Sequence, residues 1–198
     1  MDRDGAALDL GVREAAILGY SAGAYRALHL VVRRRIEWNA VIALAGFGRL
    51  PSEQREAYRR FSRQLVEGVD LTPVLVDLIL TPDLRTSSKA LVREVASWMR
   101  ATSPQSLSFE LRAYADGPNL IPMLREVRLP CLALVGDTDH TTPPARSREI
   151  AEAMPRGELE VLSGIGHAIL LEDMPRTVAA VKSFLGRVSD ESRRRWVS

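Results

Sequence analysis

The sequence predicts an α/β fold built on a mostly parallel sheet. In the first and last portions of the chain, short apolar runs alternate with amphipathic stretches, which is the pattern of strand–helix units. The middle, residues 51–125, has helical spacing throughout and no strand pattern. Three polar segments directly follow predicted strands, and the carboxyl ends of parallel strands are where open α/β sheets bind ligands.

Each element is predicted from the spacing of its apolar residues. Strands are expected where a short apolar run is bounded by turn residues, and helices where apolar residues recur three and four positions apart. Tyr58, Phe61 and Leu65, for example, share one face of a helix that begins at Ser52. The predicted strands are 14–20, 41–45, 130–135 and 158–162, and the predicted helices are 22–34, 86–99, 144–154 and 174–188, with residues 4–11 as the end of a preceding helix.

Composition indicates an ordinary globular protein. Of 198 residues, 46% are hydrophobic and 26% are charged, and no apolar run is long enough to span a bilayer. Without a signal-peptide pattern, we expect a cytoplasmic protein. The single cysteine, Cys131, opens an apolar run and is expected to be a buried thiol.

The basic residues do not indicate a nucleic-acid partner. The only lysines are Lys89 and Lys182, so nearly all the positive charge comes from arginine, as expected of a bacterial genome rich in G and C. The arginine runs 33–35 and 193–195 lack interleaved aromatic residues and are expected at the solvated surface.

The first polar segment is Gly19-Tyr20-Ser21-Ala22-Gly23, a G-x-S-x-G sequence between a predicted strand and a predicted helix. In a nucleophile elbow, glycines permit a tight turn that lifts the serine hydroxyl above the strand end. The helix N-terminus and the Ala22 amide can stabilise negative charge on a substrate oxygen. Ser21 is therefore a candidate nucleophile and Ala22 a candidate oxyanion-hole donor.

The other two segments supply a candidate acid and a candidate base. Residues 136–143 hold two aspartates, of which Asp139 is the candidate acid and Asp137 is expected to stabilise a turn. Residues 163–167 place glycines before His167, which suits a loop that brings the imidazole close to other backbone. His29 is expected within a helix, and His140 is expected to be exposed beside the acid.

Ser21, Asp139 and His167 occur in the serine–acid–histidine order of α/β-hydrolases. With its G-x-x-D-x-x-x-P and G-H segments, the chain resembles that family over essentially its whole length. The resemblance implies a partial α/β-hydrolase fold, formed by the family's last four strands with a helical cap inserted. It divides the chain into an elbow part (1–50), a cap (51–127), a C-terminal core (128–190) and a polar tail (191–198).

The resemblance also implies a mechanism. His167 would accept the Ser21 proton while Asp139 orients the imidazole, and Ser21 would form an acyl-enzyme that water then releases. No metal ion or organic cofactor is needed. Tyr20 and Trp98 are the expected substrate contacts. The expected substrate is a small carboxylic ester or lactone, with carbon–carbon bond hydrolysis and perhydrolysis as alternatives.

In the family, four strands and a loop that donates the second oxyanion-hole amide precede the nucleophile strand, and the sequence offers no substitute for them. Loss of one such donor costs about a hundred- to a thousand-fold in rate. Three hypotheses stay open. The chain is a fragment of a complete hydrolase, or it is completed by a homodimer or a separate N-terminal chain, or it is a non-catalytic interaction module. The elbow strand is expected to be an open edge that invites pairing.

Overall fold

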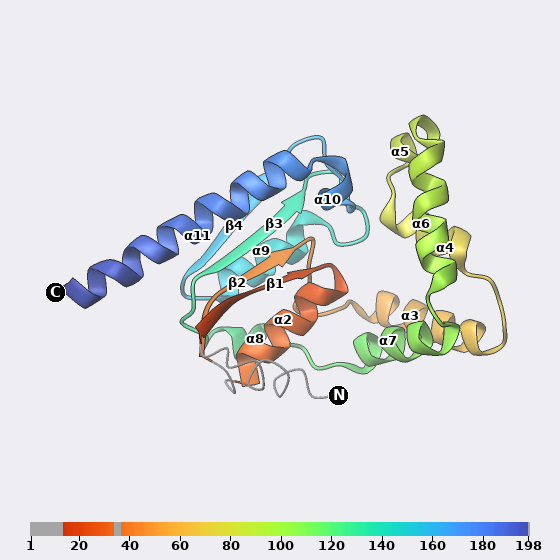
Figure 1. The fold of residues 1–198 in the computed structure, drawn as a ribbon. Coiled ribbons are helices and arrows are strands. Elements are labelled where there is room, and N and C mark those ends of the chain that lie inside the picture. The colour runs from red at the N-terminus through yellow and green to blue at the C-terminus, as the bar shows by residue number, and fades with distance from the viewer. Residues whose placement is uncertain (1–13, 34–36, 198) are drawn as a thin grey trace.

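Four parallel strands form one sheet in the computed structural model, which describes residues 14–33 and 37–197 (Figure 1). The strands are β1 (Glu14–Tyr20), β2 (Glu37–Leu44), β3 (Cys131–Gly136) and β4 (Gly157–Leu162). They lie side by side in sequence order, and the register aligns Ile17 with Val41 and Val41 with Cys131. Because all four strands run the same way, their carboxyl ends share one edge of the sheet.

Helices cover both faces of the sheet, which gives three layers. One face carries α2 (Ala22–Arg33), α8 (Ile121–Leu124) and α9 (Pro144–Ala153), and the other carries α10 (Ile169–Glu172) and α11 (Met174–Val197). Leu28 and Ile150 share a buried cluster with Val41, whereas Phe184 shares a second buried cluster with Ile42. Successive residues of a strand point to opposite faces, so β2 contributes to both clusters.

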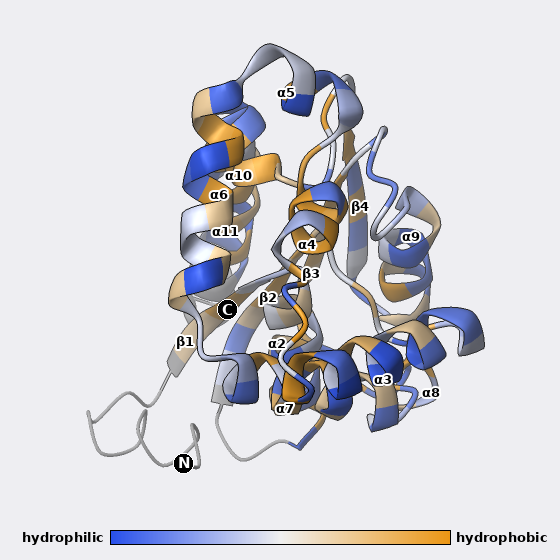
Figure 2. Cartoon of the chain, turned by 90° about the vertical axis from the view of Figure 1, so that its right-hand side faces the viewer, coloured by the Kyte–Doolittle hydropathy of each residue, from blue (hydrophilic) through white to orange (hydrophobic). Residues whose placement is uncertain are grey.

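The segment between β2 and β3 is helical, as its spacing predicts. Its helices are α3 (Ser52–Val66), α4 (Thr72–Ile79), α5 (Pro82–Ser87), α6 (Lys89–Ala101) and α7 (Pro104–Asp116), followed by α8. Figure 1 shows α3 and α7 side by side, with α4, α5 and α6 beyond the ends of the strands. Hydrophilic and hydrophobic stretches alternate along α3 and α6 in Figure 2, as expected of helices that pack on one side only.

Three boundaries differ from the prediction for local reasons. The helix predicted over 86–99 is two helices, because Ser88 ends α5 and its hydroxyl accepts a hydrogen bond from the Leu91 amide at the start of α6. Strand β2 begins at Glu37, before its continuous apolar run. Helix α11 continues to Val197, past the predicted end at residue 188 and through most of the predicted tail.

The helix predicted over 4–11 and the arginines at 34 and 35 lie outside the described residues. No helix within the described part of the chain has the length and apolar character needed to cross a bilayer.

Candidate active site

Ser21 forms the sharp turn between β1 and α2. Its φ angle is 53°, in the left-handed region that non-glycine residues seldom adopt. Two hydrogen bonds hold this turn: the Ser21 amide donates to the Leu44 carbonyl (2.8 Å), and the Ala24 amide donates to the Ser21 carbonyl (2.9 Å). The strained turn is what a nucleophile elbow requires, and it sets the serine hydroxyl at the carboxyl edge of the sheet.

The two glycines of the elbow have different roles. A Cβ atom on Gly19 would lie 2.2 Å from the Gly23 carbonyl oxygen, so only glycine fits where the helix begins against the strand. A Cβ atom on Gly23 would meet nothing within 4 Å. Of the two glycines expected to permit the tight turn, only Gly19 is therefore required by a close backbone contact.

Asp139 lies in the loop after β3 and is almost fully buried. Its Oδ1 atom accepts hydrogen bonds from the backbone amides of Thr141 (2.9 Å) and Thr142 (2.8 Å). Both amides belong to the turn that the carboxylate itself closes, which is the local reason for an aspartate here. The second oxygen, Oδ2, is thereby directed at His167.

His167 links the other two predicted residues. Its Nδ1 atom lies 2.9 Å from Asp139 Oδ2, and its Nε2 atom lies 2.9 Å from Ser21 Oγ. An ionised carboxylate only accepts hydrogen bonds, so Nδ1 carries the proton in this pair and Nε2 is left to accept from the Ser21 hydroxyl. The structure therefore brings Ser21, Asp139 and His167 together in one hydrogen-bonded chain.

The loop that carries His167 packs tightly against the end of β3. A Cβ atom on Gly136 would lie 2.1 Å from the Ile165 carbonyl oxygen, so the strand end must be glycine. Asp137 fastens the same loop by accepting from the Gly164 amide (2.7 Å) and the Ser163 hydroxyl (3.1 Å). Although desolvation acts in the opposite direction, these hydrogen bonds lower the pKa of Asp137. Asp137 thus has a structural position and Asp139 the position beside the histidine.

Thr142 and Glu172 are site residues that sequence reasoning missed. The Thr142 hydroxyl lies 2.8 Å from both Asp139 Oδ2 and the Ala45 carbonyl oxygen. The Glu172 carboxylate accepts hydrogen bonds from the backbone amides on either side of His167. Thr142 belongs to the G-x-x-D-x-x-x-P segment and Glu172 follows the G-H segment closely, but neither contact has a signal in residue spacing.

Tyr20 is close to the histidine and has a contact that the prediction did not anticipate. Its hydroxyl donates to the His167 carbonyl oxygen (2.9 Å), and the two ring centroids are 5.5 Å apart. Burial raises the pKa of Tyr20, and the charges of Asp139 and Glu172 raise it further, so the hydroxyl stays protonated as a donor. Its role as a substrate contact stays a prediction.

A cavity of about 230 Å³ lies between His167 and the α4–α5 region. Its lining includes Leu78, Thr81 and Arg85 from the α4–α5 region, together with His140. His140 is exposed beside the acid, as predicted. Arg85 pairs with Asp77 on the rim of this cavity.

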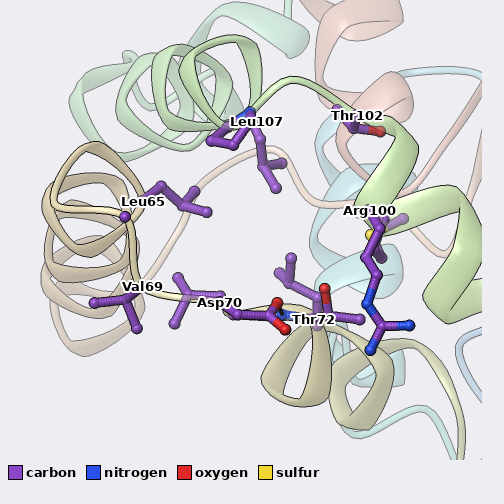
Figure 3. A pocket seen from close by; sticks show the side chains of 12 residues that line it. Leu65, Val69, Asp70, Thr72, Arg100, Thr102 and Leu107 are labelled. Carbon is purple, nitrogen blue, oxygen red and sulfur yellow. Dashed lines mark hydrogen bonds between the residues drawn. The ribbon is translucent and has the colours of Figure 1, made fainter.

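A second cavity of about 230 Å³ lies within the cap, between α3, α4, α6 and α7 (Figure 3). Leu65 and Leu107 point into it, and Leu75 and Met99 also line it. Trp98 is 45% exposed and lines neither of these two cavities. The predicted contact between Trp98 and a substrate stays a prediction.

Among the described residues, no group of three or more His, Cys, Asp or Glu side chains is placed to hold a metal ion. Cys131 is buried in β3, as predicted, and this burial raises the pKa of its thiol to about 12. The thiol is therefore protonated at neutral pH and is a poor nucleophile.

Comparison with known proteins places the chain in a family. A family model described as serine aminopeptidase, S33, matches residues 7–174. The chain therefore belongs to this family of α/β-hydrolases. Among curated relatives, a protein described as a non-heme bromoperoxidase, from Mycobacterium tuberculosis, is 29% identical over 193 residues, which cover 90% of this chain and 71% of that protein.

Solved structures of α/β-hydrolases share the fold. An esterase from Thermogutta terrifontis superposes with a TM-score of 0.85 at 21% identity, covering 94% of this chain and 70% of the esterase. An enol-lactonase from Burkholderia xenovorans superposes with a TM-score of 0.80 at 19% identity, covering 93% of this chain and 70% of the lactonase. At these identities, the similarity concerns the fold.

Proposed function

We propose that the protein is a serine hydrolase that cleaves a small carboxylic ester or lactone through an acyl-enzyme. One observation carries the proposal: Ser21 Oγ, His167 and the Asp139 carboxylate form a chain with two contacts of 2.9 Å at the carboxyl edge of the sheet. A serine hydroxyl is a weak nucleophile until an adjacent base accepts its proton. This arrangement supplies such a base, together with a carboxylate that orients it.

The proposed reaction has two halves. His167 Nε2 accepts the Ser21 proton as Oγ attacks the carbonyl carbon, and the Ala22 amide stabilises the oxyanion that forms. The imidazolium then returns the proton to the leaving oxygen, which departs as an alcohol or, in a lactone, stays attached to the acyl chain. Water, activated by the same imidazole, attacks the acyl-enzyme and releases a carboxylic acid. Nothing in this sequence of steps needs a metal ion or organic cofactor.

The cavity beside His167 supports a small substrate. A volume of about 230 Å³ is below the 300–1,000 Å³ that drug-sized ligands occupy. Its lining mixes apolar side chains with Thr81, Thr141 and Arg85, which suits a short acyl group with a polar substituent. Carbon–carbon bond hydrolysis would use the same three side chains, and it is an alternative to ester or lactone hydrolysis.

A second candidate reaction is perhydrolysis, in which hydrogen peroxide replaces water in the second half. It is favoured by the relative described as a non-heme bromoperoxidase. The chemistry needs no new protein group, because peroxide attacks the same acyl-enzyme and gives a peracid. Rates with and without peroxide on one ester separate the two reactions.

The test is a turnover screen of the purified protein with p-nitrophenyl esters of increasing acyl length, simple lactones and aminoacyl p-nitroanilides. We expect hydrolysis of short esters or lactones that Ser21→Ala abolishes. Preference for the anilides would instead favour the peptidase activity named in the family description. If a folded protein turns over none of these compounds, the result favours the hypothesis of a non-catalytic interaction module over that of an enzyme.

A further inference from the structure

The backbone on both sides of His167 is held by a single carboxylate. Glu172 Oε2 accepts from the Gly166 amide (2.8 Å), and Glu172 Oε1 accepts from the Ala168 amide (3.1 Å). Gly166 and Ala168 are both buried, so solvent water cannot reach their amides to replace these hydrogen bonds. Glu172 thus satisfies two backbone donors that flank the imidazole.

The carbonyl group of His167 is held by a residue of another element. The Tyr20 hydroxyl donates to the His167 carbonyl oxygen, and Tyr20 is the residue next to Ser21. Three hydrogen bonds from two side chains therefore fix the peptide units around His167. Tyr20 ties the histidine backbone to β1, the strand that also carries the serine.

We propose that Glu172 and Tyr20 are positioning residues for the His167 base. The inference rests on the proposed function and adds two residues that act through the histidine. The imidazole must keep both of its 2.9 Å contacts at once, and a shift of its backbone lengthens one or both. Displacement of a reacting group by about 1 Å costs on the order of a hundred-fold in rate.

The geometry at Gly166 supports a tightly defined position for Glu172. A Cβ atom on Gly166 would lie 2.2 Å from Thr81 Cγ2 and 2.9 Å from Glu172 Oε1, so this backbone is enclosed by the cap on one side and by the carboxylate on the other. Ala168 in turn is buried in an apolar cluster with Leu80 and Val95 of the cap. The loop has no room to substitute another acceptor for the carboxylate.

The decisive variant is Glu172→Gln, which keeps the size of the side chain. A carboxylate has two acceptor oxygens, whereas an amide has one and directs an NH₂ donor at the second backbone N–H. The matched control is Asp137→Asn, which removes an acceptor from the same loop at Gly164 and Ser163, away from His167. Tyr20→Phe removes the third bond and keeps the ring.

We expect Glu172→Gln to lower kcat about 10- to 100-fold with KM changed by less than about twofold. Asp137→Asn should leave kcat within about twofold of wild type. The double variant Tyr20→Phe/Glu172→Gln should lose less activity than the product of the single losses, because both bonds act on one element. Equal kcat losses in Glu172→Gln and Asp137→Asn, or full additivity, would overturn the proposal.

A second readout does not depend on turnover. The proton on His167 Nδ1, shared with Asp139, gives a downfield proton NMR resonance when the contact is held. We expect this resonance in wild type and in Asp137→Asn, and its loss by exchange broadening in Glu172→Gln. If wild type shows the resonance but no turnover, the proposed function is wrong and the positioning role is not. If Glu172→Gln keeps both the resonance and the wild-type rate, the positioning role is wrong.

Discussion

At the residue scale, the buried acid is the best-supported member of the site. Asp139 accepts hydrogen bonds from two backbone amides and from the imidazole, and the Thr142 hydroxyl lies 2.8 Å from its Oδ2 atom. Each carboxylate oxygen therefore has hydrogen-bond partners. A buried charge is tolerated only when it is hydrogen-bonded in this way. The support of Asp139 therefore determines where the imidazole can lie.

The Thr142 hydroxyl should contribute to both stability and activity. Thr142→Val keeps the shape of the side chain but leaves the Ala45 carbonyl oxygen or the Asp139 carboxylate without its donor. We expect a loss of about 1–3 kcal/mol in the free energy of unfolding, measured by urea denaturation. Thr142→Ser, which keeps the hydroxyl, should lose less than half of this, and equal losses in the two variants would contradict the assignment.

Asp137 should make stability depend on pH in the acidic range. Its pKa is lower in the folded protein than the ordinary value of 3.8, so its contribution is present above the unfolded pKa and is lost as pH falls through the folded pKa. Urea denaturation of wild type and Asp137→Asn should therefore show a stability difference at pH 7 that shrinks toward pH 2.5. A difference that stays constant over this range would show that the carboxylate charge is not involved.

Residue spacing predicted the serine, the acid and the histidine, but not the residues that hold them in place. Ser21, Asp139 and His167 each follow a strand, and parallel strands bring their carboxyl ends to one edge, so local patterns were enough to place them together. Thr142 and Glu172 act on backbone groups whose position depends on how two loops pack.

At the element scale, the turn from β1 to α2 depends on close backbone approach. The strand end and the first helical turn are in contact at Gly19, and the φ angle of Ser21 lies in the left-handed region. The strands and helices were predictable because their apolar periods are regular. The break at Ser88 and the extension of α11 were not, since caps and exposed helical turns leave little trace in an apolar pattern.

The two elbow glycines provide a matched pair of substitutions. Gly19→Ala places a methyl group against the Gly23 backbone, so we expect a loss of about 3 kcal/mol or more, or failure to fold. Gly23→Ala meets open space within α2 and should raise stability by about 0.5–1 kcal/mol. Thermal unfolding of both variants checks this, and similar effects of the two would mean that the turn is formed differently.

At the scale of the whole molecule, β1 pairs only with β2 among the described residues. Its exposed residues include Leu18, which is 48% exposed and apolar. An unprotected apolar edge pairs readily with another strand. We propose that a second copy of the chain covers this edge.

Light scattering after gel filtration tests this proposal on the 198-residue chain. We expect a concentration-dependent dimer or larger species that Leu18→Lys shifts toward monomer. Val161→Lys, on the strand at the opposite edge and 40% exposed, is the matched control and should leave the association unchanged. A wild-type chain that is monomeric at all concentrations would contradict pairing at β1.

Covalent labelling measures whether the fold activates Ser21, without knowledge of the substrate. The purified protein is treated with a fluorophosphonate, and the labelled peptide is identified by mass spectrometry beside Ser21→Ala, His167→Ala and heat-denatured samples. We predict one label, on Ser21, that is lost in both variants and on denaturation. An unlabelled Ser21 in a folded sample, or equal labelling in His167→Ala, would show that His167 does not activate the serine.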